Sequence, residues 1–278
     1  MVGGIVLAGG RSSRMGEPKA SLEWHGSTLV RRVSGLVERA VEGPVVIVRS
    51  VDQELPRLPE RYAVVEDVHG GRGPLEGLAA GLRALAGRAE LAYVSSTDVP
   101  FLHTSFVGAV VGGLGDGEEI CVPVVGRGWQ PLAAAYRTSV LAVVEELLGA
   151  DDLRVSRLFD RCRVTRLDRD ALLADAGVAN GDPDLESVVN INDPAAYAAA
   201  RERPAPAISL RWGRRGDGEP QAGRHASTVR AATLGGVADV LEIELDEVSA
   251  SVNGVAAGTD RELPLERGDA VVFTRMMR

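Results

Sequence analysis

The fold of this chain is decided by Gly3-Gly4-Ile5-Val6-Leu7-Ala8-Gly9-Gly10, where a short apolar run meets a pair of glycines. A compact apolar run of this length is typical of a buried strand in a parallel sheet. The glycines allow a tight turn and let backbone N–H groups approach an anion. The segment therefore predicts a first strand over residues 3–8 that leads into an anion-binding loop.

The loop continues as Arg11-Ser12-Ser13-Arg14-Met15-Gly16-Glu17-Pro18-Lys19 and carries three cations. Lys19 is the only lysine among 31 basic residues. A compact, mobile ammonium suits a phosphate in a way that a planar guanidinium does not. The loop has neither the glycine spacing of a dinucleotide fold nor the Ser or Thr that follows the lysine of a Walker loop. We interpret it as a loop that wraps a triphosphate; the alternatives are a flexible surface turn and a lysine left over in an arginine-rich composition.

Strands alternate with helices over the first 125 residues. The pattern predicts strands over residues 45–48, 62–65, 91–95 and 120–124, and helices over residues 28–42, 75–85 and 105–111. This alternation is typical of an α/β protein with a Rossmann-like parallel sheet between two layers of helices. In such sheets ligands bind at the carboxyl ends of the strands, here Gly9-Gly10, Glu66-Asp67 and Thr97-Asp98.

After residue 130 the pattern becomes α+β, with strands predicted over residues 132–136 and 164–167 and helices over residues 140–148 and 194–201. The segment Arg203-Pro204-Ala205-Pro206 is a stiff connector. It separates a first domain, residues 1–202, from a second, residues 207–278. In the second domain we expect strands over residues 208–212, 250–252 and 270–273 and a helix over residues 234–241.

Composition and charge exclude several classes of protein. The 278 residues are 45% hydrophobic and 25% charged, as in ordinary globular proteins. The net charge of -8 argues against a nucleic-acid surface. No apolar run approaches the length of a membrane span or of a signal peptide, so we expect no membrane partner and a cytoplasmic protein. Cys121 and Cys162 lack the spacing of a metal or redox pair and are expected to be free, buried thiols.

The glycine loop resembles the signature of nucleotidyltransferases, and most closely that of the molybdenum cofactor guanylyltransferases. Further segments match in the same order: Glu66-Asp67, Gly73-Pro74-Leu75-Glu76-Gly77, Thr97-Asp98-Val99-Pro100, Gln130-Pro131 and Val189-Asn190-Ile191-Asn192-Asp193-Pro194. The resemblance implies a three-layer nucleotidyltransferase sheet. It also implies transfer of GMP from GTP to the phosphate of molybdopterin, with Mg²⁺ as cofactor and pyrophosphate as the second product.

The resemblance and the residue chemistry together assign candidate roles. The catalytic candidates are Lys19, Arg14 and Asp98, with Asp98 as the metal ligand. The nucleotide-binding candidates are Leu7, Ala8, Gly9, Gly10, Arg11, Ser12, Ser13, Lys19, Asp67, Gly73 and Asp98. The acceptor-binding candidates are Asn190, Asn192, Arg154 and Arg157.

Several of these residues have a simpler interpretation. For Asp98 the alternative is a cap of the helix after Pro100, and for Asp67 it is a solvated loop acid. For Asn190 and Asn192 the alternative is a turn before a helix, and for Arg154 and Arg157 it is a solvated helix face. The chain also departs from the family, which often has an Asn near the end of the second strand where this chain has Val48-Arg49-Ser50. An apolar Val48 side chain cannot donate a hydrogen bond to a base or a ribose.

The second domain resembles the β-grasp sulfur carriers of molybdopterin and thiamin synthesis over Ser251-Val252-Asn253-Gly254 and residues 263–273. Those carriers act through a C-terminal Gly-Gly, whereas this chain ends Arg275-Met276-Met277-Arg278. We therefore expect that the module carries no sulfur and instead docks on a protein partner or on its own catalytic domain.

Two other functions fit the sequence. One is a nucleotidyltransferase that uses CTP on molybdopterin, or GTP on another phosphorylated acceptor. The other is a non-catalytic protein that binds or delivers molybdopterin. The presence of Lys19 and Asp98 favours an enzyme, whereas the missing second-strand Asn favours the binding protein.

Overall fold

The computed structural model describes residues 1–10, 15–16, 18–67, 72–126, 128–214 and 227–275. The chain forms two compact units. The first contains Met1–Leu22 and Thr28–Tyr197, and the second contains Glu23–Ser27 and Ala198–Arg278.

The first unit is built on a mixed sheet with the strand order β10-β7-β9-β6-β1-β4-β5, to which β8 adds beside β7. Its strands are β1 (Val2–Leu7), β4 (Val45–Arg49), β5 (Ala63–Glu66), β6 (Leu91–Ser96), β7 (Ile120–Val125), β8 (Gly128–Trp129), β9 (Ala133–Arg137) and β10 (Val164–Leu167). β1 pairs in parallel with β4 and β6, and β4 pairs in parallel with β5. The carboxyl ends of four neighbouring strands therefore meet at one edge, and the predicted α/β fold is confirmed.

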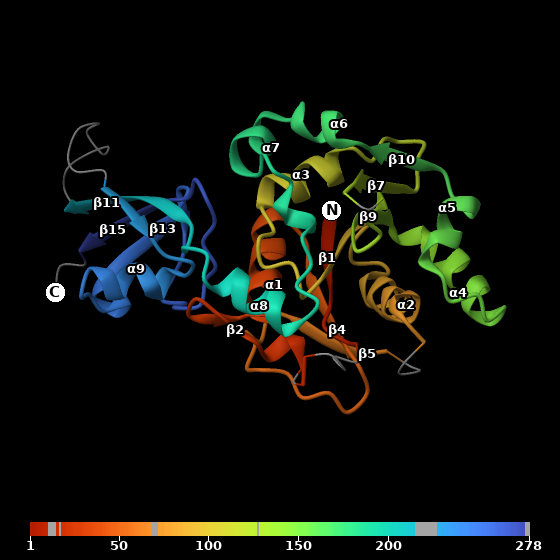
Figure 1. Ribbon diagram of the computed structural model, residues 1–278, viewed down its shortest axis with the longest axis horizontal. Coiled ribbons are helices and arrows are strands. Elements are labelled where there is room, and N and C mark those ends of the chain that lie inside the picture. The colour runs from red at the N-terminus through yellow and green to blue at the C-terminus, as the bar shows by residue number, and fades with distance from the viewer. Residues whose placement is uncertain (11–14, 17, 68–71, 127, 215–226, 276–278) are drawn as a thin grey trace. The chain divides into compact units, whose positions relative to one another are not determined.

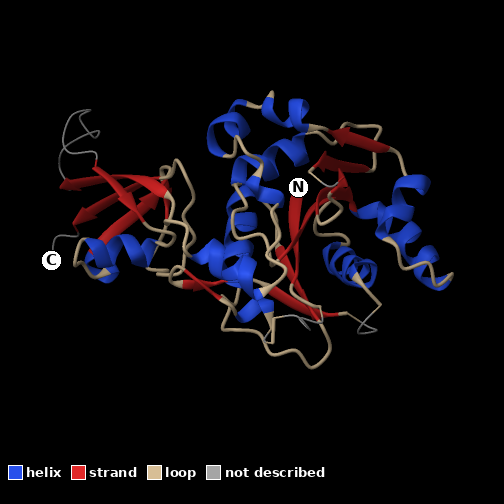
Figure 2. Ribbon diagram, in the orientation of Figure 1, coloured by secondary structure: helices blue, strands red, loops and turns tan. Residues whose placement is uncertain are grey.

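Helices cover both faces of this sheet (Figures 1 and 2). One core joins the sheet to α1 (Leu29–Ala40), α3 (Thr104–Gly112), α6 (Arg169–Leu173) and α7 (Ala176–Gly181). The other joins it to α2 (Pro74–Leu85), α4 (Leu141–Gly149) and α5 (Leu158–Arg161). Helix α1 begins where the Thr28 side chain accepts a hydrogen bond from the Arg31 N–H. The two cores are what hold the carboxyl edge of the sheet in place.

Strand β9 has a place that the sequence did not predict. The sequence predicted this segment as part of an α+β region after residue 130. In the structure it lies between β6 and β7 and runs antiparallel to both. Its residues Ala133–Tyr136 are all buried. Small alanine side chains fit a strand that is covered by helices on both faces. The insertion places the preceding residues, Gln130–Leu132, beside the end of β6.

The second unit contains a five-stranded sheet with the order β12-β11-β15-β13-β14. Its elements are β11 (Ala207–Arg214), β12 (Ser227–Arg230), α9 (Leu234–Val240), β13 (Val248–Val252), β14 (Val255–Ala256) and β15 (Ala270–Arg275). β11 and β15 pair in parallel at the centre, and the other pairs are antiparallel. Its core packs α9 against one face, with Leu234, Val237 and Phe273 fully buried.

The boundary between the units lies within α8 (Pro194–Arg201), before the Pro204–Pro206 connector that the sequence indicated. The second unit also includes the turn between β2 (Glu23–Trp24) and β3 (Ser27–Thr28). Within this unit Glu23 pairs with Arg201 at 2.6 Å, and the Ser27 hydroxyl donates to Glu262 at 3.2 Å. Such contacts between residues far apart in sequence leave no local signal, which is why the sequence division missed them.

Cys121 is buried and Cys162 is half-buried, and both are free thiols. Burial raises the pKa of Cys162 to about 11 and that of Cys121 to about 12. The thiolate is the reactive form of cysteine, so neither side chain is activated at neutral pH.

Among the described helices, none combines the length and the apolar character that a membrane crossing requires.

Candidate active site

A cavity of about 430 Å³ opens at the carboxyl edge of the first unit's sheet. It brings together eight of the residues selected from the sequence: Leu7, Ala8, Gly9, Gly10, Lys19, Asp67, Gly73 and Asp98. The other residues that line it are Val48, Ser50, Pro74, Gly77, Ser96, Thr97 and Leu132. Most of these residues lie at the ends of β1, β4, β5 and β6 and at the start of α2. The cavity is therefore where a doubly wound sheet places its ligand.

The glycines after β1 form one wall of the cavity. A Cβ atom on Gly9 would lie 2.8 Å from the Ser50 Oγ and 3.1 Å from the Ser50 nitrogen, so only glycine fits there. Gly10 has a φ of 140°, a conformation that favours glycine. The Gly9 N–H donates to the Val48 carbonyl at 3.2 Å, which fixes the loop to the end of β4. The candidates Arg11, Ser12, Ser13 and Arg14 lie outside the described residues.

Lys19 and Asp98, which both line the cavity, form an ion pair. The Lys19 Nζ lies 2.8 Å from the Asp98 Oδ2 and 2.9 Å from the Asn192 Oδ1. The other carboxylate oxygen of Asp98 accepts hydrogen bonds from the Ser96 hydroxyl at 2.6 Å and from the Asn190 Nδ2 at 3.1 Å. The two side chains are only 21% and 13% exposed, which reduces the screening of their charges by water. A cation, a carboxylate and two carboxamides thus converge on one point.

Asp98 is not a helix cap, because the N-cap of α3 is His103. Asn190 and Asn192 belong to a strap, residues 186–192, that crosses the end of β6. The strap is held where the Ile191 N–H donates to the Asp98 carbonyl at 2.8 Å.

Asp182 also holds the strap, at its first two residues. The buried Asp182 carboxylate accepts hydrogen bonds from the N–H groups of Glu186 at 2.6 Å and Ser187 at 3.1 Å. The Ser187 hydroxyl in turn accepts a hydrogen bond from the His103 N–H at 3.0 Å. These contacts fix the turn that precedes Asn190, so both carboxamides are held at Asp98 before any ligand binds.

Asp67 also lines the cavity, after β5, and is 9% exposed. It is therefore not a solvated loop acid. Burial raises the pKa of its carboxyl group, and the negative charges of Glu76 and Glu66 add to the effect, while a hydrogen bond from the Val51 backbone lowers it. The buried Asp67 Oδ1 has no hydrogen-bond partner among the described residues. An ionised oxygen in this position gains from a ligand that supplies N–H or O–H donors.

The family match starts near the N-terminus and ends within the first unit. Residues 4–165 match the family described as "MobA-like NTP transferase domain". The chain belongs to this family. A protein from Desulfosudis oleivorans named molybdenum cofactor guanylyltransferase is 33% identical over 192 residues, which cover 69% of this chain and 90% of that protein. A protein from Bacillus cytotoxicus named probable molybdenum cofactor guanylyltransferase is 34% identical over 166 residues, 59% of this chain and 82% of its own length.

Solved structures show the same fold for this nucleotidyltransferase. Molybdopterin-guanine dinucleotide biosynthesis protein A from Archaeoglobus fulgidus has a TM-score of 0.59 and 24% identity, and the match covers 72% of this chain and 97% of that one. The 2-C-methyl-D-erythritol 4-phosphate cytidylyltransferase from Thermus thermophilus has a TM-score of 0.50 and 18% identity, with 71% and 96% covered. A protein whose name refers to a guanine dinucleotide and one named a cytidylyltransferase therefore share this fold.

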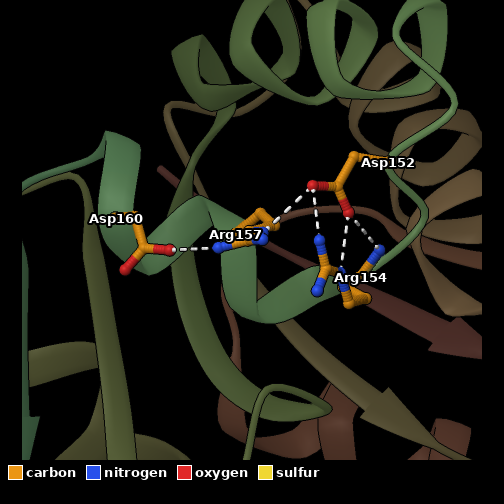
Figure 3. Close-up of polar contacts among 4 residues, drawn as sticks. All are labelled: Asp152, Arg154, Arg157 and Asp160. Carbon is orange, nitrogen blue, oxygen red and sulfur yellow. Dashed lines mark hydrogen bonds and ion pairs between the residues drawn. The ribbon is translucent and has the colours of Figure 1, made fainter.

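Arg154 and Arg157 are not among the residues that line the nucleotidyltransferase cavity. Both guanidinium groups donate to the carboxylate of Asp152, at 2.9 Å and 3.0 Å, and Arg157 also pairs with Asp160 (Figure 3). The hydrogen bond from Arg154 lowers the pKa of Asp152 to about 2, with a further contribution from Arg157. Each arginine is thus neutralised in an exposed cluster. The structure places both arginines in this exposed cluster and not among the cavity-lining residues, and their role in binding the acceptor's phosphate stays a prediction.

Sequence reasoning missed Ser50, Ser96 and Leu132 as cavity residues. Ser96 could have been predicted from the sequence, because it is the last residue of β6 and lies two residues before Asp98. Ser50 directly follows β4, and its place beside Gly9 depends on the parallel pairing of β1 with β4, which no local pattern shows. Leu132 reaches the cavity only because β9 inserts beside β6.

Proposed function

We propose that this nucleotidyltransferase transfers GMP from GTP to the phosphate of molybdopterin and releases pyrophosphate. The observation that carries the proposal is the convergence of Asn190 and Asn192 on Lys19 and Asp98, which line one cavity together with Gly9 and Gly10. The names of the relatives from Desulfosudis oleivorans and Bacillus cytotoxicus support the choice of nucleotide and acceptor.

The nucleotide occupies the large cavity in this proposal. The N–H groups of the Gly9-Gly10 loop bind the β- and γ-phosphates, together with Arg14 and the other cations of the loop. The base lies toward Asp67 and Gly73. A guanine presents two neighbouring donors, N1–H and N2–H₂, which match a carboxylate with an unpartnered oxygen. The Ser50 hydroxyl supplies a polar group near Val48, where the family's usual Asn is missing.

Mg²⁺ fits the donor set at Asp98. Mg²⁺ prefers oxygen ligands and is usually held by one or two carboxylates together with phosphate oxygens and water. Asp98 would supply the carboxylate, and the Ser96 hydroxyl and the Asn192 carboxamide add neutral oxygens beside it. When bound, the ion would neutralise charge on the triphosphate.

The chain's own residues then position the reactants. Nucleotidyl transfer depends on in-line placement and charge stabilisation more than on covalent participation of the protein. The Lys19 ammonium leaves its ion pair to bridge phosphoryl oxygens, and the glycine loop retains the leaving pyrophosphate. Asn190 and Asn192 hold the acceptor on the far side of Asp98. The attacking oxygen is already an ionised phosphate oxygen, so no general base is required.

GTP together with Mg²⁺ should raise the melting temperature of the full chain more than CTP, ATP or UTP does. A ligand that binds only the native state stabilises it by about 2.7 kcal/mol at a hundred times its Kd. Differential scanning fluorimetry with each nucleotide measures the effect. A larger shift with CTP would favour the cytidylyltransferase alternative. A GTP shift without pyrophosphate release in the presence of molybdopterin would favour the binding or delivery protein.

We also propose that the second unit is a β-grasp module that docks on a protein partner rather than carrying sulfur. A parallel pair at the centre of a five-stranded sheet, with a single helix packed against one face, supports the assignment. The last three residues, 276–278, lie outside the described residues.

A further inference from the structure

Gln53 does not line the large cavity, but its side chain is bonded to two residues that do. It is half-buried and lies in the turn that follows β4. Its carboxamide is hydrogen-bonded to Ala8, directly after β1, and to Ser50, directly after β4. Both of these residues line the cavity. Gln53 therefore ties together two strand ends that form one wall of the nucleotide's cavity.

The hydrogen bonds of Gln53 fix the direction in which its carboxamide faces. The Gln53 N–H donates to the Ser50 carbonyl at 3.1 Å, and the Ser50 N–H donates back to the Gln53 Oε1 at 3.0 Å. Because the amide oxygen is used within the turn, the Nε2 group is left to donate to the Ala8 carbonyl, at 2.9 Å. The Arg49 guanidinium also holds the turn, because it donates to the Gln53 carbonyl at 2.9 Å and to the Glu66 carboxylate at 2.7 Å. The carboxamide is thus oriented before any ligand binds.

The contact with Gln53 holds one end of the peptide unit that joins Ala8 to Gly9. The carbonyl of this unit accepts the hydrogen bond from Gln53, and its N–H donates to the Val48 carbonyl at 3.2 Å. A peptide unit is planar, so bonds at both ends fix its rotation about the chain. The next N–H belongs to Gly10, which lines the cavity, and this group has no hydrogen-bond partner among the described residues. The direction of the first loop amides therefore depends on Gln53, since glycines by themselves allow many conformations.

We propose that Gln53 is a positioning residue for the nucleotide's phosphates, because it holds the Ala8–Gly9 peptide with the following loop amides directed at the β- and γ-phosphates. The inference rests on the proposed function and specifies what orients the glycine loop. Without this contact the peptide rotates, and only the molecules whose amides face the cavity bind the triphosphate at full affinity. The apparent Kd then rises in inverse proportion to the fraction of such molecules.

A matched pair of variants tests the proposal by titration calorimetry of the full chain with GTP and Mg²⁺. Gln53→Met keeps an unbranched side chain of similar length but removes the donor to Ala8 and the acceptor for Ser50. Glu54→Met places the same residue one position along, at an exposed side chain that does not line the cavity. We expect the Kd for GTP to rise about tenfold in Gln53→Met and to stay within twofold of wild type in Glu54→Met. Wild-type affinity in a folded Gln53→Met would overturn the proposal.

The ratio of the affinities for GTP and ITP separates an effect on the phosphates from a general disturbance of the cavity. ITP carries the same triphosphate and lacks only the 2-amino group of the base, so the ratio reports the base end, at Asp67 and Gly73 in the proposed complex. We expect Gln53→Met to weaken both nucleotides equally and to leave the ratio within twofold of wild type. A larger change in the ratio would mean that Gln53 shapes the base site, which contradicts the proposal.

A second variant, Gln53→Glu, isolates the contact with Ala8 and keeps the test decisive if Gln53→Met does not fold. Its carboxylate still accepts the hydrogen bond from Ser50 but sets an acceptor against the Ala8 carbonyl. Val51→Glu adds the same charge two residues away, at a side chain that is 46% exposed, and so controls for repulsion of the triphosphate. We expect at least tenfold weaker GTP binding in Gln53→Glu and a change of less than threefold in Val51→Glu. Equal affinity of these two variants refutes this inference alone, whereas failure of the wild type to bind GTP refutes the proposed function.

Discussion

Asp98→Ala is expected to lower kcat about 10²–10³-fold, a loss comparable with removing one major electrostatic stabiliser from an active site. The Asp98 carboxylate holds Lys19, Ser96 and Asn190 in place and would hold Mg²⁺ on the triphosphate. Alanine removes both functions. The measurement is the rate of pyrophosphate release with saturating GTP, Mg²⁺ and molybdopterin.

Two further variants separate charge from structure. Asp98→Asn keeps the size of the side chain but loses its charge, and we expect nearly the same loss of kcat. Asp152→Ala removes a carboxylate that pairs with arginines in the exposed cluster outside the cavity, and we expect kcat to stay unchanged. Wild-type turnover in Asp98→Ala, with a normal melting temperature, would remove Asp98 from the catalytic machinery.

Lys19→Arg is expected to reduce kcat/KM about 10²-fold although the positive charge is kept. The Lys19 ammonium fits between the Asp98 Oδ2 and the Asn192 Oδ1, which lie 2.8 Å and 2.9 Å from its nitrogen. A guanidinium is wider and planar, so it cannot occupy this gap and also follow the phosphoryl oxygens during transfer. Steady-state kinetics with GTP as the varied substrate measures the effect.

The matched control exchanges the same two residue types outside the cavity. Arg157→Lys changes a guanidinium to an ammonium within the Asp152 cluster, and we expect kcat/KM within twofold of wild type. Equal activity of Lys19→Arg and wild type would mean that the single lysine of the chain has no special role in transfer.

The sequence predicted the parts of the fold that local patterns determine. An apolar run before Gly9-Gly10 and the alternation of strands and helices were enough to place β1, β4, β5 and β6 in one parallel sheet. Parallel pairing brings the residues that follow these strands to one edge, and for that reason Asp67 and Asp98 could be assigned to the same cavity in advance. The carboxamides of Asn190 and Asn192 were found through the family resemblance and lie at Asp98.

Other features depend on contacts that leave no local trace. The alanine-rich run of β9 has the same appearance whether it forms a separate sheet or inserts beside β6, so the role of Leu132 was not visible. Arg154 and Arg157 have the spacing of an anion site, and in the structure both pair with the neighbouring Asp152. Their predicted role toward the acceptor's phosphate stays a prediction.

Positional labelling of the nucleotide tests the central claim most directly. The full chain is incubated with Mg²⁺, molybdopterin and GTP labelled at either the α- or the γ-phosphate. The account predicts that the α-label appears in a product containing both guanine and the pterin, while the γ-label is released in pyrophosphate. Transfer of the γ-label to the acceptor, or release of either label only as inorganic phosphate, would contradict it.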